Sequence, residues 1–298
     1  MKHLLLSTVI LAAGLLASSC CATEDSHANE SAPCCSIAGS VAHLQGSLGF
    51  ELGNDEFGAW SKLKWPLDGM LGGIEGAVTW PLDAGCAILV SARYGRSLSL
   101  GGTGKDWDWR PWEQPGMSDY SETDSSGTLQ TLDLRAGFRL PAVDGVNLQL
   151  IAGYSRSSVD FDDEDLTGSY DYGQTPIEYP GLAATYSAAF SGFCLGGEVM
   201  ARASDKLTLS ARLEAMVNLS VSADGDWVRR GNSFSQNARG MGLTLAGKAG
   251  YEIRNNVTLT AQVEWISRSA EDGQQSGTQE LIRNRFSQRV ATACRDRH

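Results

Sequence analysis

A long run of strict alternation between apolar and polar side chains, from Leu207 to Val221, constrains this chain more than any other feature. Its odd positions carry only Leu, Ala and Val, whereas its even positions carry Thr, Ser, Arg, Glu, Met and Asn. A period of two residues is typical of a β-strand, and globular strands average only about five or six residues. The run therefore predicts an unusually long strand with one apolar face. Similar alternation covers residues 131–140, 243–253 and 257–265.

Strands of this kind are typical of an outer-membrane barrel, in which the apolar faces meet lipid and the polar faces line the lumen. The connections also alternate, with short turns near 83–85, 141–145, 203–206 and 254–256 and long polar segments near 53–59, 101–128, 162–178, 222–238 and 269–281. Counting predicts ten strands, from 43–52 to 282–294. We therefore predict an all-β fold, a ten-stranded antiparallel transmembrane β-barrel with periplasmic turns and extracellular loops.

Composition excludes two other classes of protein. Lys plus Arg is 24 against 35 for Asp plus Glu, a net charge of −11, and phosphate backbones need a basic surface, so no nucleic-acid partner is expected. Beyond the first twenty residues no apolar run reaches the roughly 18 residues of a membrane-spanning helix. These exclusions leave the barrel as the leading class.

The beginning of the chain has the pattern of a secretory signal peptide. Lys2 and His3 precede an apolar stretch that is too short to span a bilayer, and small residues follow it. We predict a signal peptide over 1–22, a disordered lead-in over 23–42 and the barrel over 43–298, located in the cell outer membrane. Lipid attachment at Cys20 is an alternative to cleavage after residue 22.

Two long connections repeat the same acidic pattern beside tryptophan. Asp106 and Asp108 lie in one, and Asp224 and Asp226 lie in the other. If these loops face each other across the barrel mouth, carboxylates confined over a water molecule can share protons and act as acid and base. The alternative is a solvated acidic rim or a weak divalent-cation site. No motif has metal-ligand spacing, so no structural metal is predicted.

Short motifs in collinear order give the chain a resemblance to the omptin family of outer-membrane endopeptidases. They cover nearly the whole mature chain, so their specificity comes from their order rather than from any one of them. The motifs are Ser61 to Trp65, Ile74 to Trp80, Asp106 to Trp109 followed by Gly116 and Asp119, Ala152 to Tyr154, Gly168 to Tyr170, and Ala249 to Tyr251.

The resemblance implies an aspartic-type endopeptidase that cuts near basic residues at the extracellular rim. Carried across, the catalytic residues are Asp106, Asp108 and Asp226, and the substrate-binding residues are Asp224 and Asp119. It also implies cationic peptide substrates, a monomer, contact with outer-membrane lipid and a requirement for lipopolysaccharide, with no other cofactor.

One departure from the omptin pattern bears directly on catalysis. The family pairs an aspartate with a histidine two residues later, but Val228 stands where that histidine would be. General acid–base catalysis is worth about 10² to 10⁴ in rate, so its loss matters. Two hypotheses therefore stand: an endopeptidase that works with carboxylates alone, or a catalytically inactive omptin-fold barrel that serves as an adhesin or structural protein.

Overall fold

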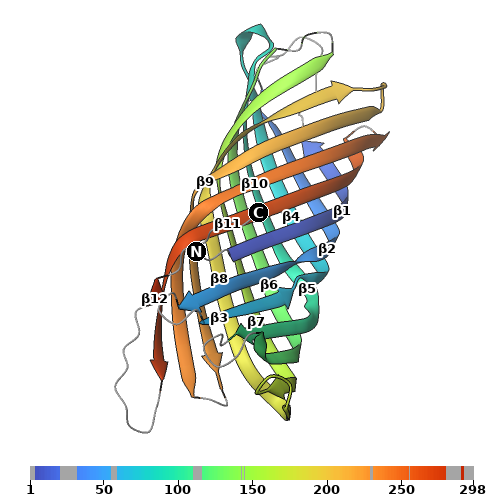
Figure 1. Ribbon diagram of the computed structural model, residues 1–298. Coiled ribbons are helices and arrows are strands. Elements are labelled where there is room, and N and C mark those ends of the chain that lie inside the picture. Colours follow the sequence, from blue (N-terminus) through green and yellow to red (C-terminus); the bar gives the residue numbers. More distant parts are fainter. Residues whose placement is uncertain are drawn as a thin grey trace.

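The computed structural model describes residues 4–20, 32–54, 59–109, 116–141, 143, 145–228, 231–254, 256–279 and 290–291. Almost all of them lie in strands, which tilt strongly and close around a lumen (Figure 1). The strands are β1 (Leu4–Cys20), β2 (Cys34–Asn54), β3 (Ala59–Pro66), β4 (Asp68–Pro81), β5 (Ala87–Trp109), β6 (Met117–Arg139), β7 (Val146–Tyr170), β8 (Thr175–Arg202), β9 (Leu207–Trp227), β10 (Asn232–Arg254), β11 (Val257–Gln279) and β12 (Val290–Ala291).

The sheet is antiparallel and closed, because β1 pairs with both β11 and β2. Strands β3 and β4 pair with the same two neighbours, β2 and β5, and are successive halves of one position interrupted at Leu67. The wall therefore has ten strand positions, which confirms the predicted ten-stranded antiparallel barrel. Closure leaves no open edge in the wall, as a strand that crosses lipid requires. Among the described residues no helix is long and apolar enough to span a membrane.

The two ends of the predicted barrel differ from the sequence-based boundaries. Strand β2 begins at Cys34, so the predicted lead-in over 23–42 is wrong over residues 34–42, where Ser and Gly obscure the alternation. The position beside β11 that 282–294 was predicted to fill is taken by β1, whose residues lie in the predicted signal peptide. Of the predicted last strand, only Val290–Ala291 lies in the described residues, as β12 paired with β11. Cleavage after residue 22 stays a prediction.

The four connections between β4 and β11 at one end are the predicted short turns, and we refer to that end as the turn end. At the opposite end, the rim end, the predicted long loops are largely strand. Most of 101–128, 162–178, 222–238 and 269–281 continues β5 to β11, with tight connections such as 171–174 between β7 and β8. Continuing the ladder satisfies backbone N–H and C=O groups that a loop would leave to water.

A band of exposed apolar side chains surrounds the half of the barrel nearer the turn end. Such a band is the lipid-facing surface of a membrane barrel. It includes Ile74, Val90, Leu98, Leu134, Leu150, Phe193, Leu213, Leu245 and Val263, each at least 45% exposed.

In the rim half the arrangement is reversed, with apolar side chains inside and polar ones outside. An aromatic plug, which we define as Phe50, Trp65, Phe161, Tyr186 and Phe234, fills the lumen there. The rings of Trp65 and Tyr186 stack with centroids 4.1 Å apart and an interplanar angle of 9°. Leu44, Leu48 and Leu219 around them are fully buried. The rim half is thus built like a water-soluble β-barrel, with its own core.

On β9 the reversal occurs at one residue, Asn218. Asn218 has a positive φ of 52° and is the extra residue in a bulge, because the pairing with both β8 and β10 shifts beside it. Glu214 and Met216 face the lumen before the bulge, whereas Leu219 and Val221 face it afterwards. A bulge of one residue exchanges the two faces of a strand, and Asn tolerates left-handed φ better than most residues.

A second bulge lies at the same level on β5. The pairing with β4 and with β6 shifts around Leu98, which gives β5 one more residue than either neighbour. Arg93 faces the lumen before this bulge, and Leu100 is buried in the lumen after it. The even-numbered residues of β5 therefore face inward in the rim half.

Candidate functional site

The predicted site residues on β5 and β6 lie on the inner face at the rim. Asp106 pairs across the ladder with Leu63 and Ser121, both buried, and its Oδ1 accepts a hydrogen bond from Ser61 Oγ at 3.2 Å. Asp108 lies two residues further along β5 and pairs directly with Asp119. The structure therefore brings Asp106, Asp108 and Asp119 together on one wall.

Asp119 has a clear local role, because it fixes the neighbouring turn between β7 and β8. Its Oδ1 accepts a hydrogen bond from the backbone N–H of Asp171 at 3.1 Å, and its Oδ2 accepts one from Ser118 Oγ at 3.1 Å. Ser118 Oγ also lies 3.0 Å from the carbonyl oxygen of Asp108. The carboxylate predicted to bind substrate thus has partners within the protein.

The predicted site residues on β9 lie on the outer face instead. Asp224 and Asp226 are exposed, whereas Ala223, which precedes them, and Gly225, which lies between them, are buried. A Cβ at Gly225 would come within 2.2 Å of the Phe234 ring, which places the inner face of β9 against the aromatic plug. The expectation that Asp226 faces Asp106 and Asp108 across the mouth is therefore wrong, because the bulge at Asn218 turns its side chain outward.

No described histidine can replace the missing one. The only histidine whose side chain lies in the described residues is His43, an exposed residue on β2 that is 3.8 Å from Asp68 Oδ1. Val228 is 49% exposed, and its backbone N–H donates to the carbonyl of Ala183. No cluster of three or more His, Cys, Asp or Glu in the described part of the chain could hold a metal ion.

The acidic run on β7 is divided between the two faces of the sheet. Asp160, Asp162 and Glu164 are exposed, whereas Asp163 points into the rim core. Asp163 Oδ2 accepts a hydrogen bond from Trp65 Nε1 at 2.8 Å, and Oδ1 accepts one from Ser125 Oγ. Burial raises the pKa of the Asp163 carboxyl, and these hydrogen bonds offset part of the rise.

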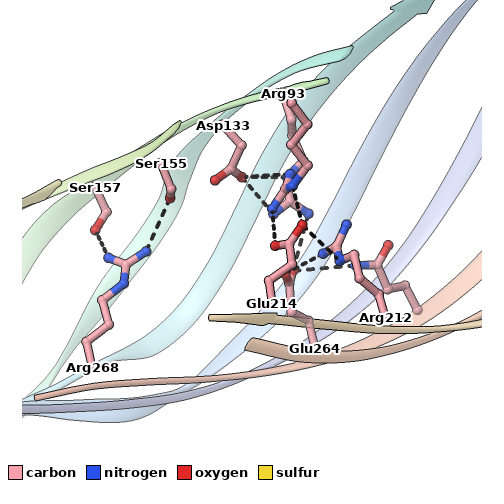
Figure 2. A network of polar contacts seen from close by, with 10 residues as sticks. Arg93, Asp133, Ser155, Ser157, Arg212, Glu214, Glu264 and Arg268 are labelled. Atoms are coloured by element: carbon pink, nitrogen blue, oxygen red, sulfur yellow. Dashed lines mark hydrogen bonds and ion pairs between the residues drawn. The ribbon is translucent and has the colours of Figure 1, made fainter. Parts of the chain in front are cut away.

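A second polar arrangement was not predicted as a site and lies in the lumen between the rim core and the turn end. Six charged side chains form a closed ring in which signs alternate, and Figure 2 labels all of them but Arg135. We call it the charge ring. Its members in order are Arg93, Asp133, Arg135, Glu214, Arg212 and Glu264, with successive N to O distances of 2.8, 3.7, 2.8, 3.8, 2.8 and 3.2 Å back to Arg93.

The charge ring joins strands that lie far apart in the wall, since its members come from β5, β6, β9 and β11. Glu214 and Glu264 are about 2% exposed, and each carboxylate contacts two guanidinium groups. A buried charge is tolerated when it is paired and hydrogen-bonded in this way. The sequence signal was available, because each member occupies a polar, lumen-facing position of an alternating strand, but alternation does not reveal which charges meet.

Above the ring, Arg268 on β11 crosses the lumen to β7. Its guanidinium donates to Ser157 Oγ and, at 3.4 Å, to Ser155 Oγ (Figure 2), and it lies 5.9 Å from the centre of the Phe190 ring. The lumen therefore contains, from the turn end to the rim end, an open cavity, the charge ring, the Arg268 contacts and the aromatic plug.

These features define the class of protein: an outer-membrane β-barrel with an omptin-like fold and a filled lumen. The family model described as Pom, Protochlamydia outer membrane protein, matches residues 56–292. The chain belongs to this family. Among solved structures, the outer membrane protease OmpT from Escherichia coli matches with a TM-score of 0.60 at 15% identity, covering 90% of this chain and 95% of that one.

Other membrane barrels resemble the chain less. The toluene transporter TbuX from Ralstonia pickettii has a TM-score of 0.33 at 10% identity, covering 90% of this chain and 88% of its own. The translocator domain of the autotransporter NalP from Neisseria meningitidis has a TM-score of 0.30 at 11% identity, with 90% and 87% coverage. No curated protein matches the chain. At 15% identity the likeness to OmpT establishes the fold and leaves the activity open.

Proposed function

We propose that this protein is a structural outer-membrane barrel, non-proteolytic and non-conducting, with its rim half exposed at the cell surface as a scaffold or adhesin. One observation carries the proposal: the rim core occupies the space in which a proteolytic cleft would have to lie. Trp65 stacks on Tyr186 beneath the rim, with Phe234 packed at a tilt beside Tyr186, and Asp226 is on the outer face of the wall.

The orientation is inferred from how far the strands continue beyond the apolar band at each end. Membrane barrels place short turns in the periplasm and longer extensions outside, so we assign the turn end to the periplasm and the rim end to the cell surface. Outer-membrane lipid, including lipopolysaccharide, then surrounds the apolar band. The protein is proposed to work as a monomer with no cofactor.

Two measurements on refolded protein test this function. We expect no turnover of a dibasic fluorogenic peptide between pH 5 and 8, and no ion leak from vesicles that contain the protein. Turnover that Asp106→Ala abolishes and Asp124→Ala leaves intact would contradict the proposal, since Asp124 is an exposed carboxylate on β6 remote from the inner-face cluster. A conductance step in planar bilayers would contradict the sealed lumen.

Restoring the family histidine gives a further check. Because residue 226 faces outward, Val228→His is expected to give no proteolysis, even with lipopolysaccharide present. A gain of activity in Val228→His would show that Asp226 and the new imidazole reach the inner wall, and it would overturn the assignment of the two faces of β9.

A second candidate function, an aspartic endopeptidase, is favoured by the clustering of Asp106, Asp108 and Asp119 on one inner wall. Carboxyl groups held close to one water molecule can serve as acid and base in hydrolysis. Such an enzyme would cut cationic peptides without Asp224 or Asp226. Equal turnover by wild type and by a double Asp224→Ala, Asp226→Ala variant, with loss in Asp106→Ala, would favour it over the structural role.

A further inference from the structure

The turn end of the lumen contains a cavity that the proposed structural role does not use. Its volume is about 400 Å³, and residues of all strands from β2 to β11 except β3 line it. Cavities of roughly 300 to 1,000 Å³ are the size that binds small molecules in proteins. The wall is unusually rich in hydrogen-bond donors. They include Ser36, Ser91, Gln149, Ser210, Thr258 and Thr260.

The cavity is bounded towards the rim by the charge ring. Arg93, Arg135 and Arg212 line this cavity. Their partner carboxylates do not: Asp133, Glu214 and Glu264 line a separate small pocket of about 60 Å³ on the other side, which Arg93 and Arg135 also line. Although the ring has no net charge, only its guanidinium groups, and none of its carboxylates, line the cavity.

Two further cations on the cavity wall have no acidic neighbour in the sheet. Arg139 pairs across its ladders with Ala87 and Gln149, and Lys248 pairs with Ser210 and Gln262. The two acidic residues on the wall, Glu75 and Glu198, pair instead with ring arginines. The wall thus holds five cationic side chains against two carboxylates.

Buried polar atoms on the same wall also have no hydrogen-bond partner among the described residues. They are Nε of Arg139, Nε of Arg212 and Oγ1 of Thr260. Thr260 is only 8% exposed. A buried polar atom without a partner is costly, so these three residues leave the polar wall of the cavity incompletely satisfied.

We propose that this cavity is a binding site for a small soluble polyanion that bears phosphate or carboxylate groups. Guanidinium groups bind both kinds of oxyanion through paired N–H donors, and hydroxyl groups complete the shell. The ligand enters from the turn end, which the orientation above assigns to the periplasm, and the charge ring stops it from passing further.

The experiment is calorimetric titration of the full chain, refolded in detergent at low salt, with inorganic pyrophosphate and separately with citrate. We expect saturable one-to-one binding of at least one of them, weakened as salt screens the charges. In the double variant Arg139→Gln, Lys248→Gln we expect at least about a tenfold rise in Kd, because two charge-assisted contacts are lost. The ring residues are left intact so that folding is preserved.

Two control variants separate site binding from general attraction. Lys206→Gln removes an exposed lysine from the turn between β8 and β9 that does not line the cavity, and it should leave Kd unchanged. Lys248→Arg retains the charge and should bind the probe with nearly the Kd of the wild type. No saturable binding of either probe at millimolar concentration would overturn the proposal. So would an equal Kd in wild type and the double variant when both migrate as the folded form on unheated gels. Neither outcome bears on the structural role, which is tested by proteolysis and leak.

Discussion

Strands β5 and β9 begin alike and end differently, although each contains a single extra residue at the same level of the barrel. Below their bulges the two strands are equivalent: β5 supplies Arg93 and β9 supplies Arg212, and both guanidinium groups contact the carboxylate of Glu264. Above the bulges, β5 turns Asp106 inward and β9 turns its carboxylates outward. The register of each strand therefore determines whether its acidic side chains face the lumen or solvent, even where the acidic motifs are alike.

The bulge on β9 also allows one strand to fit both lipid and water. An uninterrupted alternation would carry the apolar face of β9 from lipid into water. The bulge at Asn218 instead moves Leu219 and Val221 into the rim core, and the polar positions that follow face solvent. On β5 and β9 a bulge thus separates the lipid-facing half of the strand from its water-facing half.

The largest expected effect comes from deletion of Asn218. Without the extra residue, Leu219 and Val221 would face water and Asp224 would enter the aromatic plug, so we expect most chains to fail to fold. Asn218→Gly, which allows the positive φ, should fold like the wild type. The readout is the fraction that migrates as the compact form on an unheated gel. Normal folding of the deletion variant would refute the role given to the bulge.

The next effect compares the contributions of the two strands below their bulges. Arg93→Leu leaves Asp133 and Glu264 with one cation fewer, and breaking a buried ion pair costs about 3–5 kcal/mol. Arg212→Leu should cost less, because Arg212 makes one close contact, at 2.8 Å to Glu264, and a longer one at 3.8 Å to Glu214. Urea unfolding in detergent measures both free energies. Equal losses of under 1 kcal/mol would mean that the charge ring does not support the barrel.

A smaller effect is expected at Gly225, between the two outward carboxylates. A methyl group there would overlap the ring of Phe234, and overpacking a core costs about 1–3 kcal/mol. Gly247→Ala on β10 is the matched control, because no atom lies within 4 Å of its added Cβ. A Gly225→Ala variant as stable as Gly247→Ala would show that this face of β9 does not meet the plug.

The smallest effect is the contribution of Asp163, on the β5 side of the rim, to the pH dependence of the unfolding free energy. A Cβ at Gly104 of β5 would come within 3.4 Å of Asp163 Oδ1, so this carboxyl lies against the strand that turns inward. Because burial raises its pKa, folding favours the protonated form. Stability is then greatest below the ordinary aspartate pKa and falls as pH rises through the raised one.

Unfolding free energies of wild type and Asp163→Asn between pH 3 and 7, in the same detergent, measure this contribution. The wild-type curve should fall more steeply with rising pH than the curve of Asp163→Asn, which keeps an acceptor for Trp65. Parallel curves would assign the pH dependence to other groups. Asp162→Asn, a neighbouring exposed position on the same strand, is the control.

The sequence predicted the barrel because lipid contact enforces one apolar face over many residues, and that pattern is visible at Leu207 to Val217. It did not predict how strands continue beyond lipid. The alternation in the sequence passes through Asn218 without a break, whereas the backbone adds a residue there and exchanges the faces. The prediction that Asp224 and Asp226 lie in a loop and face inward is therefore wrong, although they do lie at the end of the barrel opposite the short turns.

The charge ring shows what a sequence pattern can and cannot predict about charged side chains in the lumen. That Arg135, Arg212 and Glu214 point inward follows from alternation, and it is confirmed. Which cation meets which carboxylate depends on the tilt and curvature of the closed sheet, because the contacts join residues such as Arg93 and Glu264, 171 positions apart. A short-range periodic pattern cannot predict a contact between residues so far apart in the sequence.

The bulge at Asn218 has a consequence for how such barrels diversify. A substitution at the rim alters one side chain, but the gain or loss of a single residue within a strand exchanges everything beyond it between interior and surface. Length changes in strands are thus the mutations that can hide or expose an entire acidic motif in one step. Two relatives with matching rim motifs can therefore carry the same aspartates on opposite faces of a strand. Before a catalytic aspartate is transferred from one chain to another, the number of residues between the lipid band and the rim should be compared in both.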